Sequence, residues 1–250
     1  MSVHLVVYSN GEPYDTTKKL TIESVHKYTN KRVIIHEYSL DTIRTKEWFE
    51  ALKNLPNIHK HGRRDGYYNC WKAFITKDVF DDAMEEGDIL YYVDSSRYFQ
   101  TGFTENIDVL CDIASQKLCI AGSIGTNVRN DSYGCCDDVT VWNHIVSDGD
   151  KHLSKPHVLN SWFLFKKCDS NREFIHDWVH YSVLLAADGA PLVTCHHTGD
   201  QSIFNILVIK HKKLVFHHPN VDHDTNKNKN VVLGIVNNTA SSNEYFCFLA

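Results

Sequence analysis

The stretch Gly87-Asp88-Ile89-Leu90-Tyr91-Tyr92-Val93-Asp94-Ser95-Ser96 decides the fold class of this chain. Its centre, 89–93, is an unbroken run of apolar, β-branched and aromatic residues, which predicts a buried strand of a parallel sheet. The run ends abruptly on Asp94. Because ligands of open α/β sheets bind beyond the carboxyl ends of the strands, we expect Asp94 to face a ligand site. The alternative is that Asp94 only begins a turn or caps a helix.

Strand and helix patterns alternate on both sides of this run. A strand over 4–9, a helix over 16–28 and a strand over 32–38 predict a βαβ unit with parallel strands. Further helices are expected over 41–56, 71–86, 170–187 (with Ser170 as its cap) and 201–210, and further strands over 158–166 and 214–216. We therefore expect one α/β domain over 1–250, with a central, mostly parallel sheet flanked by helices. Residues 224–250 are read as a polar linker and a C-terminal extension.

Composition excludes several classes of protein. The 250 residues include 26 Lys and Arg against 31 Asp and Glu, and this net charge of −5 argues against a nucleic-acid binder that works by bulk electrostatics. The 16 histidines and 8 cysteines suggest a metal, but no Cys-x-x-Cys pair is present and Cys135-Cys136 are adjacent, which is not zinc-site spacing. With no signal-peptide pattern and no long apolar run, we expect a soluble, cytoplasmic protein without a transmembrane segment.

Basic and aromatic residues precede the deciding run. Arg64, Tyr67, Trp71 and Lys72 lie around two glycines, a mixture that suits a nucleotide phosphate together with a stacking face. The alternative is a solvated loop followed by a helix whose aromatic side chains enter the core.

These segments resemble a known family. The stretch Gly66-Tyr67-Tyr68-Asn69-Cys70-Trp71-Lys72 resembles the Gly-Tyr-x-x-Trp-Lys-Pro motif of bacterial and large-virus nucleotide-sugar glycosyltransferases, which have the Rossmann-like GT-A fold. Residues 87–94 resemble the Gly-Asp-Ile-Leu-x-Tyr-x-Asp motif of the same enzymes. Asn160-Ser161 and Asp200-Gln201 resemble two further motifs of glycogenin-like enzymes, in the expected order. The resemblance extends over about residues 5–220.

The resemblance implies transfer of a sugar from a UDP- or GDP-sugar donor to a hydroxyl of a glycan or glycoprotein acceptor, with retention of configuration favoured. The residues it implies for the donor and nucleotide are Tyr8, Ser9, Arg64, Tyr67, Trp71, Lys72, Asp94, Ser95, Ser96 and Arg97. Asn160, Ser161 and Asp200 are implied for the sugar or acceptor, and Asp200 and Gln201 for catalysis. Asp137 or Asp138 is the alternative general base.

The resemblance also implies Mn²⁺ or Mg²⁺ on Asp94, Ser96 and His218, with His217 and His223 as alternatives to His218. The chain departs from the family pattern here, because Ser96 stands where the second acid of the Asp-x-Asp motif belongs. Arg97 is expected to neutralise part of the diphosphate in its place.

Two other functions remain open from the sequence. A catalytically inactive GT-A-like module that binds a glycan or nucleotide is favoured by the missing second acid. A zinc hydrolase is suggested by His176 and His180, which lie at i and i+4 with Asp177 in place of the usual glutamate.

Overall fold

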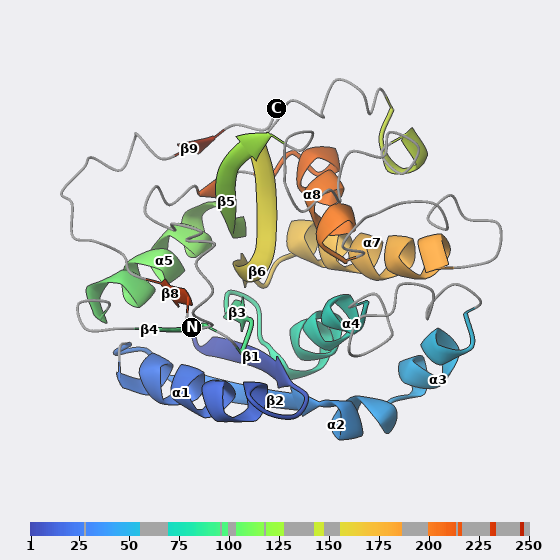
Figure 1. The fold of residues 1–250 in the computed structure, drawn as a ribbon. Coiled ribbons are helices and arrows are strands. Elements are labelled where there is room, and N and C mark those ends of the chain that lie inside the picture. Colours follow the sequence, from blue (N-terminus) through green and yellow to red (C-terminus); the bar gives the residue numbers. More distant parts are fainter. Residues whose placement is uncertain are drawn as a thin grey trace.

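The deciding run forms β3 (Ile89–Val93), the middle strand of a five-stranded sheet, and all five of its residues are buried (Figure 1). The strand order is β2 (Val33–Ser39), β1 (Val3–Ser9), β3, β6 (Pro156–Lys166) and β5 (Cys119–Asn127). The computed structural model describes residues 1–27, 29–55, 70–95, 97–99, 104–117, 119–127, 143–147, 156–186, 200–213, 215–216, 231–233 and 246–247.

Four of the five strands run in one direction. β1 pairs in parallel with β2 and β3, as the βαβ pattern of the first 40 residues predicts. β6 is antiparallel to both β3 and β5, so it alone is reversed. The expected α/β fold with a central, mostly parallel sheet is therefore confirmed. Because β6 is reversed, its early residue Asn160 lies at the edge where β1 and β3 end.

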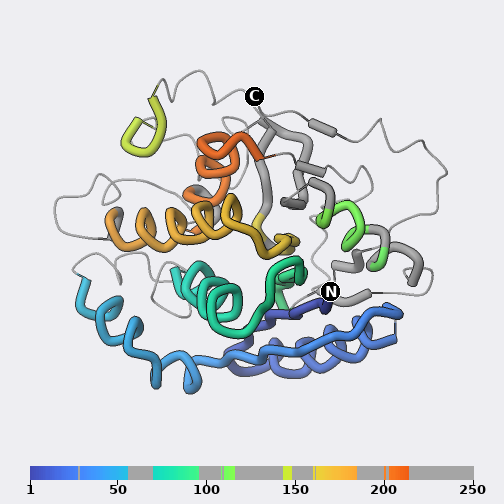
Figure 2. Tube along the Cα trace, turned by 180° about the vertical axis from the view of Figure 1, so that it is seen from behind, coloured from blue at the N-terminus to red at the C-terminus, as the bar shows by residue number. Residues whose placement is uncertain are grey.

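Helices cover both faces of the sheet. α1 (Tyr14–Lys27) and α5 (Thr104–Lys117) lie on one face, and α4 (Trp71–Asp78), α7 (Asp169–Ala186) and α8 (Asp200–Lys210) lie on the other (Figures 1 and 2). The two-residue period of β3 divides its side chains between these layers. Leu90 and Tyr92 join the core with α4, α7 and α8, whereas Tyr91 faces α1 and α5.

The remaining elements are shorter. They are α2 (Leu40–Arg44), α3 (Glu47–Lys53), the π-helical turn η1 (Val79–Ala83), β4 (Arg97–Phe99) paired with β8 (Val231–Leu233), and β7 (Val215–Phe216) paired with β9 (Phe246–Cys247).

The single helix expected over 41–56 is wrong, because α2 ends at Arg44 and α3 begins at Glu47. Ser39 starts α2 through a capping box, in which its hydroxyl accepts from the Thr42 N–H at 3.3 Å and the Thr42 hydroxyl accepts from the Ser39 N–H at 2.7 Å. Lys46 then adopts an extended backbone and separates the two helices. The apolar spacing stays helical across this break, so the sequence pattern does not reveal it.

Two other helix boundaries differ from expectation. Ser170 is not the cap of α7, because the helix already begins at Asp169, and the Ser170 hydroxyl instead accepts from Lys213 Nζ at 2.7 Å. The helix expected over 71–86 changes to π geometry over η1 and ends before Met84, which is extended.

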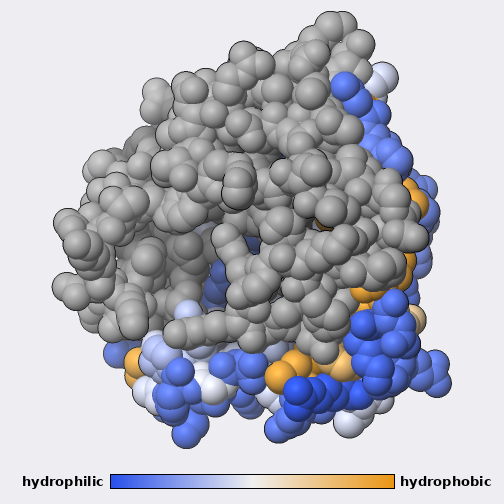
Figure 3. All heavy atoms as spheres, turned by 45° about the vertical axis from the view of Figure 1, so that its right-hand side comes forward, coloured by the Kyte–Doolittle hydropathy of each residue, from blue (hydrophilic) through white to orange (hydrophobic). Residues whose placement is uncertain are grey.

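On the face that Figure 3 shows, the described residues along the lower edge are mostly hydrophilic, with smaller hydrophobic patches between them. No helix in the described part is long and apolar enough to span a bilayer.

Candidate active site

Lys72 lies between two carboxylates at the carboxyl edge of the sheet. Its Nζ is 3.2 Å from Asp94 Oδ1 and 3.4 Å from Asp200 Oδ2, and its side chain is only 7% exposed. Three elements bring these groups together: Lys72 is in the first turn of α4, Asp94 follows β3 directly, and Asp200 begins α8. The first six residues of α4 are all buried, which carries the lysine into the interior.

Asn160 of β6 joins the same cluster. Its backbone carbonyl accepts from Lys72 Nζ at 3.2 Å and its side-chain Oδ1 accepts at 3.4 Å, while its Nδ2 donates to Asp200 Oδ2. Trp178 Nε1 of α7 donates to the Asp200 carbonyl at 3.3 Å. Asp200 is therefore fixed through both its side chain and its backbone, and it is 2% exposed.

Tyr92 is a member of the cluster that the sequence did not predict. Its hydroxyl donates to Asp94 Oδ1 at 2.7 Å, and Lys72 Nζ lies 5.0 Å from the centre of its ring. A signal for it exists in the sequence, because residues i and i+2 of a strand point to the same face, which places Tyr92 on the side of Asp94.

Burial and charge act against each other at these groups. Burial alone lowers the pKa of Lys72, but the facing carboxylates of Asp94 and Asp200 outweigh it and raise that pKa, so the ammonium stays charged. Burial raises the pKa of Asp200, which Lys72 and the Asn160 amide offset only in part. With both carboxylates ionised, the cluster carries a net charge of −1. A diphosphate therefore needs further positive charge to bind here.

A cation held by Asp94 is one possible source of that positive charge. The Asp94 side chain is 34% exposed, and among the described residues only Lys72 and Tyr92 bond to it, both at Oδ1. Magnesium is commonly held by one or two carboxylates together with substrate phosphates and water, so Oδ2 of Asp94 fits as a single protein ligand. Within the described ranges no group of three or more His, Cys, Asp or Glu side chains could hold a metal by itself.

Tyr8 and Trp71 lie next to the cluster and stack on each other, with ring centres 3.8 Å apart. Both belong to the core, each 5% exposed, and Trp71 Nε1 has no hydrogen-bond partner among the described residues. The Ser9 hydroxyl donates to Asp15 Oδ1 at 2.5 Å. Ser95 is buried, and its carbonyl accepts from the Thr21 hydroxyl at 3.4 Å.

The structure thus brings together Lys72, Asp94, Asn160 and Asp200, four of the residues for which the resemblance implies a role. Other expected residues are placed only by their backbone or not at all. Arg97, Ser161 and Gln201 lie in β4, β6 and α8, and their side chains are not among those that the structure describes. Arg64, Tyr67, Ser96, Asp137, Asp138, His217, His218 and His223 lie outside the described residues.

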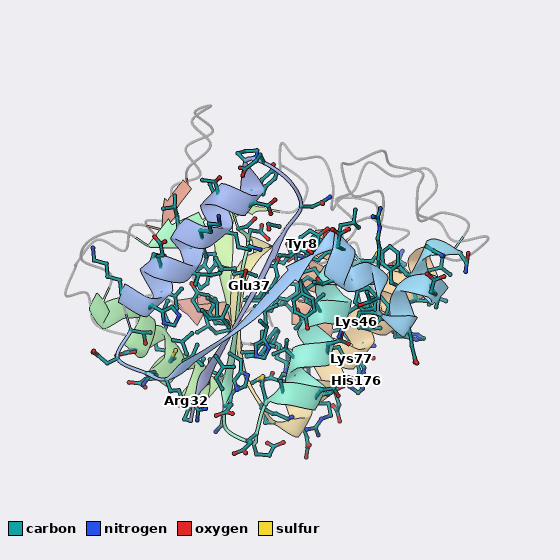
Figure 4. The ribbon with its side chains drawn as sticks, turned by 90° about the horizontal axis from the view of Figure 1, so that it is seen from below. Tyr8, Arg32, Glu37, Lys46, Lys77 and His176 are labelled. Carbon is teal, nitrogen blue, oxygen red and sulfur yellow. The ribbon has the colours of Figure 1, made fainter. Side chains whose placement is uncertain are left out.

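The zinc-like pair on α7 has other partners. His176 Nε2 lies 2.9 Å from Asp81 Oδ2, which Lys77 Nζ also contacts at 3.0 Å, and Figure 4 shows His176 and Lys77 side by side. His180 is exposed and packs edge-on against Tyr181. In the described part of the chain, no third ligand accompanies the two histidines.

No protein-family model matches the sequence, and no curated protein sequence matches it. Among solved structures, the chain is similar to the apo form of mouse xyloside xylosyltransferase 1, with 12% sequence identity and a TM-score of 0.49 over 86% of this chain and 84% of that one. It is also similar to 4-diphosphocytidyl-2C-methyl-D-erythritol synthase from Anaerococcus prevotii, with 12% identity and a TM-score of 0.41 over 86% of this chain and 87% of that one.

Proposed function

We propose that the protein transfers a sugar from a nucleoside diphosphate sugar, UDP- or GDP-linked, to a hydroxyl group of a glycan or glycoprotein acceptor. The observation that carries this proposal is the Lys72 ammonium, buried between Asp94 and Asp200 at the edge of the sheet where α/β proteins bind their ligands. The sequence motifs that resemble nucleotide-sugar transferases fall on the same residues.

The chemistry follows from the charges. The bond between sugar C1 and the diphosphate oxygen breaks, and the electron pair leaves with the nucleoside diphosphate. A bond from C1 to the acceptor oxygen forms. Negative charge grows on the leaving group, and a fixed positive group at that place stabilises the transition state, an effect worth about 10²–10³ in rate for one donor. Lys72 is the described residue suited to this task, because its ammonium stays charged although buried.

A divalent cation on Asp94 would add to the same charge stabilisation when bound, since Mn²⁺ or Mg²⁺ neutralises a diphosphate. We assign Asp94 as its described ligand and Ser96 and His218 as further candidates.

The acceptor hydroxyl must also lose a proton. Asp200 Oδ2 is engaged by Lys72 and by Asn160, and the residue is almost fully buried. This supports an orienting role toward Lys72 and the sugar for Asp200, and a reaction in which the leaving phosphate takes the proton with retention of configuration.

A donor screen tests the proposal. Purified protein should show a rise in melting temperature with UDP or GDP, because a ligand that binds only the folded state stabilises it by mass action. It should also hydrolyse one nucleotide sugar slowly without acceptor, in an assay that compares reactions with and without added Mn²⁺. Asp94→Ala should abolish this turnover, whereas Asp112→Ala, an exposed acid on α5, should leave it unchanged. Full activity of Asp94→Ala, or no response to any nucleotide, contradicts the proposal. Binding without turnover indicates the inactive binding module instead.

A further inference from the structure

Tyr92 connects the two charged groups that face the proposed donor. Its hydroxyl donates to Asp94 Oδ1 at 2.7 Å, the same oxygen that Lys72 Nζ approaches at 3.2 Å. Its ring lies 5.0 Å from the ammonium, within the range of a cation–π contact. One side chain therefore contacts both members of the Lys72–Asp94 pair.

The core fixes the place of this hydroxyl. The Tyr92 ring is fully buried and stacks on Phe163 of β6, with centres 4.9 Å apart and planes 12° apart. Leu90, two residues earlier on the same face, contributes only apolar contacts to that core. Because the ring is held in this core, the hydroxyl is fixed where it donates to Asp94 Oδ1. Asp94 is thus held by a rigid donor, whereas its other oxygen is not engaged by the described residues.

We propose that Tyr92 is a positioning residue of the donor site. It holds Asp94 Oδ1 toward Lys72 and leaves Oδ2 to the donor or to a cation bound with it. This inference rests on the proposed function, and it predicts that Tyr92 acts on nucleotide binding only through Asp94.

A double-mutant cycle separates this role from simple packing. Tyr92→Phe keeps the ring and removes the hydroxyl, and Asp94→Asn keeps the shape of the side chain and removes its charge. We expect Tyr92→Phe to weaken the binding of UDP or GDP by about tenfold, the size typical of a lost hydrogen bond to a charged group. In the Asp94→Asn background the same change should weaken binding less than twofold, because the partner of the hydroxyl has lost its charge. Titration calorimetry measures all four affinities.

Tyr91→Phe is the matched control, because Tyr91 lies on the opposite face of β3 and packs against the other core. It should leave nucleotide affinity unchanged. Equal losses from Tyr92→Phe in both backgrounds would mean that Tyr92 acts through general packing, and an unchanged affinity in the native background would mean that it has no role; either result overturns the inference. If the native protein binds neither UDP nor GDP, the proposed function fails and the inference falls with it, which is distinct from binding that does not depend on Tyr92.

Discussion

At the scale of single residues, Lys72 is the side chain whose charge most constrains the site. Removing one partner of a buried ion pair leaves the other charge uncompensated, which typically costs about 3–5 kcal/mol. Lys72→Met should therefore lower the free energy of unfolding by about that amount, measured by urea denaturation at pH 7. Because Asp200 is the more deeply buried of the two acids, adding Asp200→Asn should restore part of the loss.

The control for this prediction is Lys77→Met, the same substitution on the same helix. Lys77 is 37% exposed and pairs with Asp81 at i and i+4, so its loss should cost less than about 1 kcal/mol. Similar losses of stability in the two variants would contradict the prediction that burial makes the loss of the Lys72 charge more costly.

The residues of the site differ in how far the sequence reveals them. Asp94 is predictable from the pattern alone, because it ends an apolar strand at the edge where ligands of such sheets bind. Lys72 is suggested by the basic and aromatic residues around it, whereas Asn160 and Asp200 depend on the family resemblance. Tyr92 lies inside an apolar run, where an aromatic residue is expected to be core. Its i and i+2 relation places it on the same face as Asp94, but the hydrogen bond between them is seen only in the structure.

At the scale of elements, a pair of histidines links β1 to β2. His4 Nδ1 lies 2.9 Å from His36 Nε2, and His4 Nε2 lies 3.3 Å from Asp88 Oδ2, just before β3. Burial lowers the pKa of His36 to about 4, with His4 adding to the shift. Burial also lowers the pKa of His4, against the opposing effect of Asp88, and the charges of Lys167 and Arg32 add to the decrease.

These shifts predict a loss of stability in weak acid. Because the folded histidines bind a proton less readily than the unfolded ones, their contribution is complete above about pH 6.5 and is lost as the pH falls toward about 4. We expect a decrease of about 2 kcal/mol in the free energy of unfolding, discounted because the His36 ring is partly exposed. Urea denaturation between pH 7.5 and 4.5 measures it. In His36→Phe the decrease should be markedly smaller, and an equal slope in both proteins contradicts the assignment.

Element boundaries show where sequence patterns lose information. The apolar spacing over 41–56 is helical throughout, yet the capping box at Ser39 and the extended Lys46 divide it into α2 and α3. The direction of β6 is equally hidden, because an apolar strand buried on both faces has the same pattern whether its neighbours are parallel or antiparallel. It is this reversed strand that brings Asn160 to Lys72.

At the scale of the whole molecule, the candidate site joins two parts of the chain. The early part holds β1, β2, β3 and α4, and the late part holds β6, α7 and α8. Lys72 and Asp94 come from the first part, and Asn160 and Asp200 come from the second. The antiparallel ladder between β3 and β6 pairs five residues of each, from Ile89 with Lys166 to Val93 with Trp162. One buried cluster also continues from β1 and α4 across to α7 and α8. Neither part can therefore complete its core alone, and we expect both to unfold together.

Two tryptophans can report the unfolding of the two parts separately. Trp48 of α3 lies in the early part and stacks on Phe74 of α4, whereas Trp178 lies in the late part, fully buried on α7. In variants that retain only one of them, with the other tryptophans changed to phenylalanine, the urea midpoint from fluorescence should coincide with the midpoint from far-UV circular dichroism of the same variant, as in a two-state transition. The substitutions will shift stability between variants, so each comparison is made within one protein. A Trp48 signal that changes at a different urea concentration from the circular dichroism would show that the early strands unfold independently, and the site would then lie between two separately stable parts.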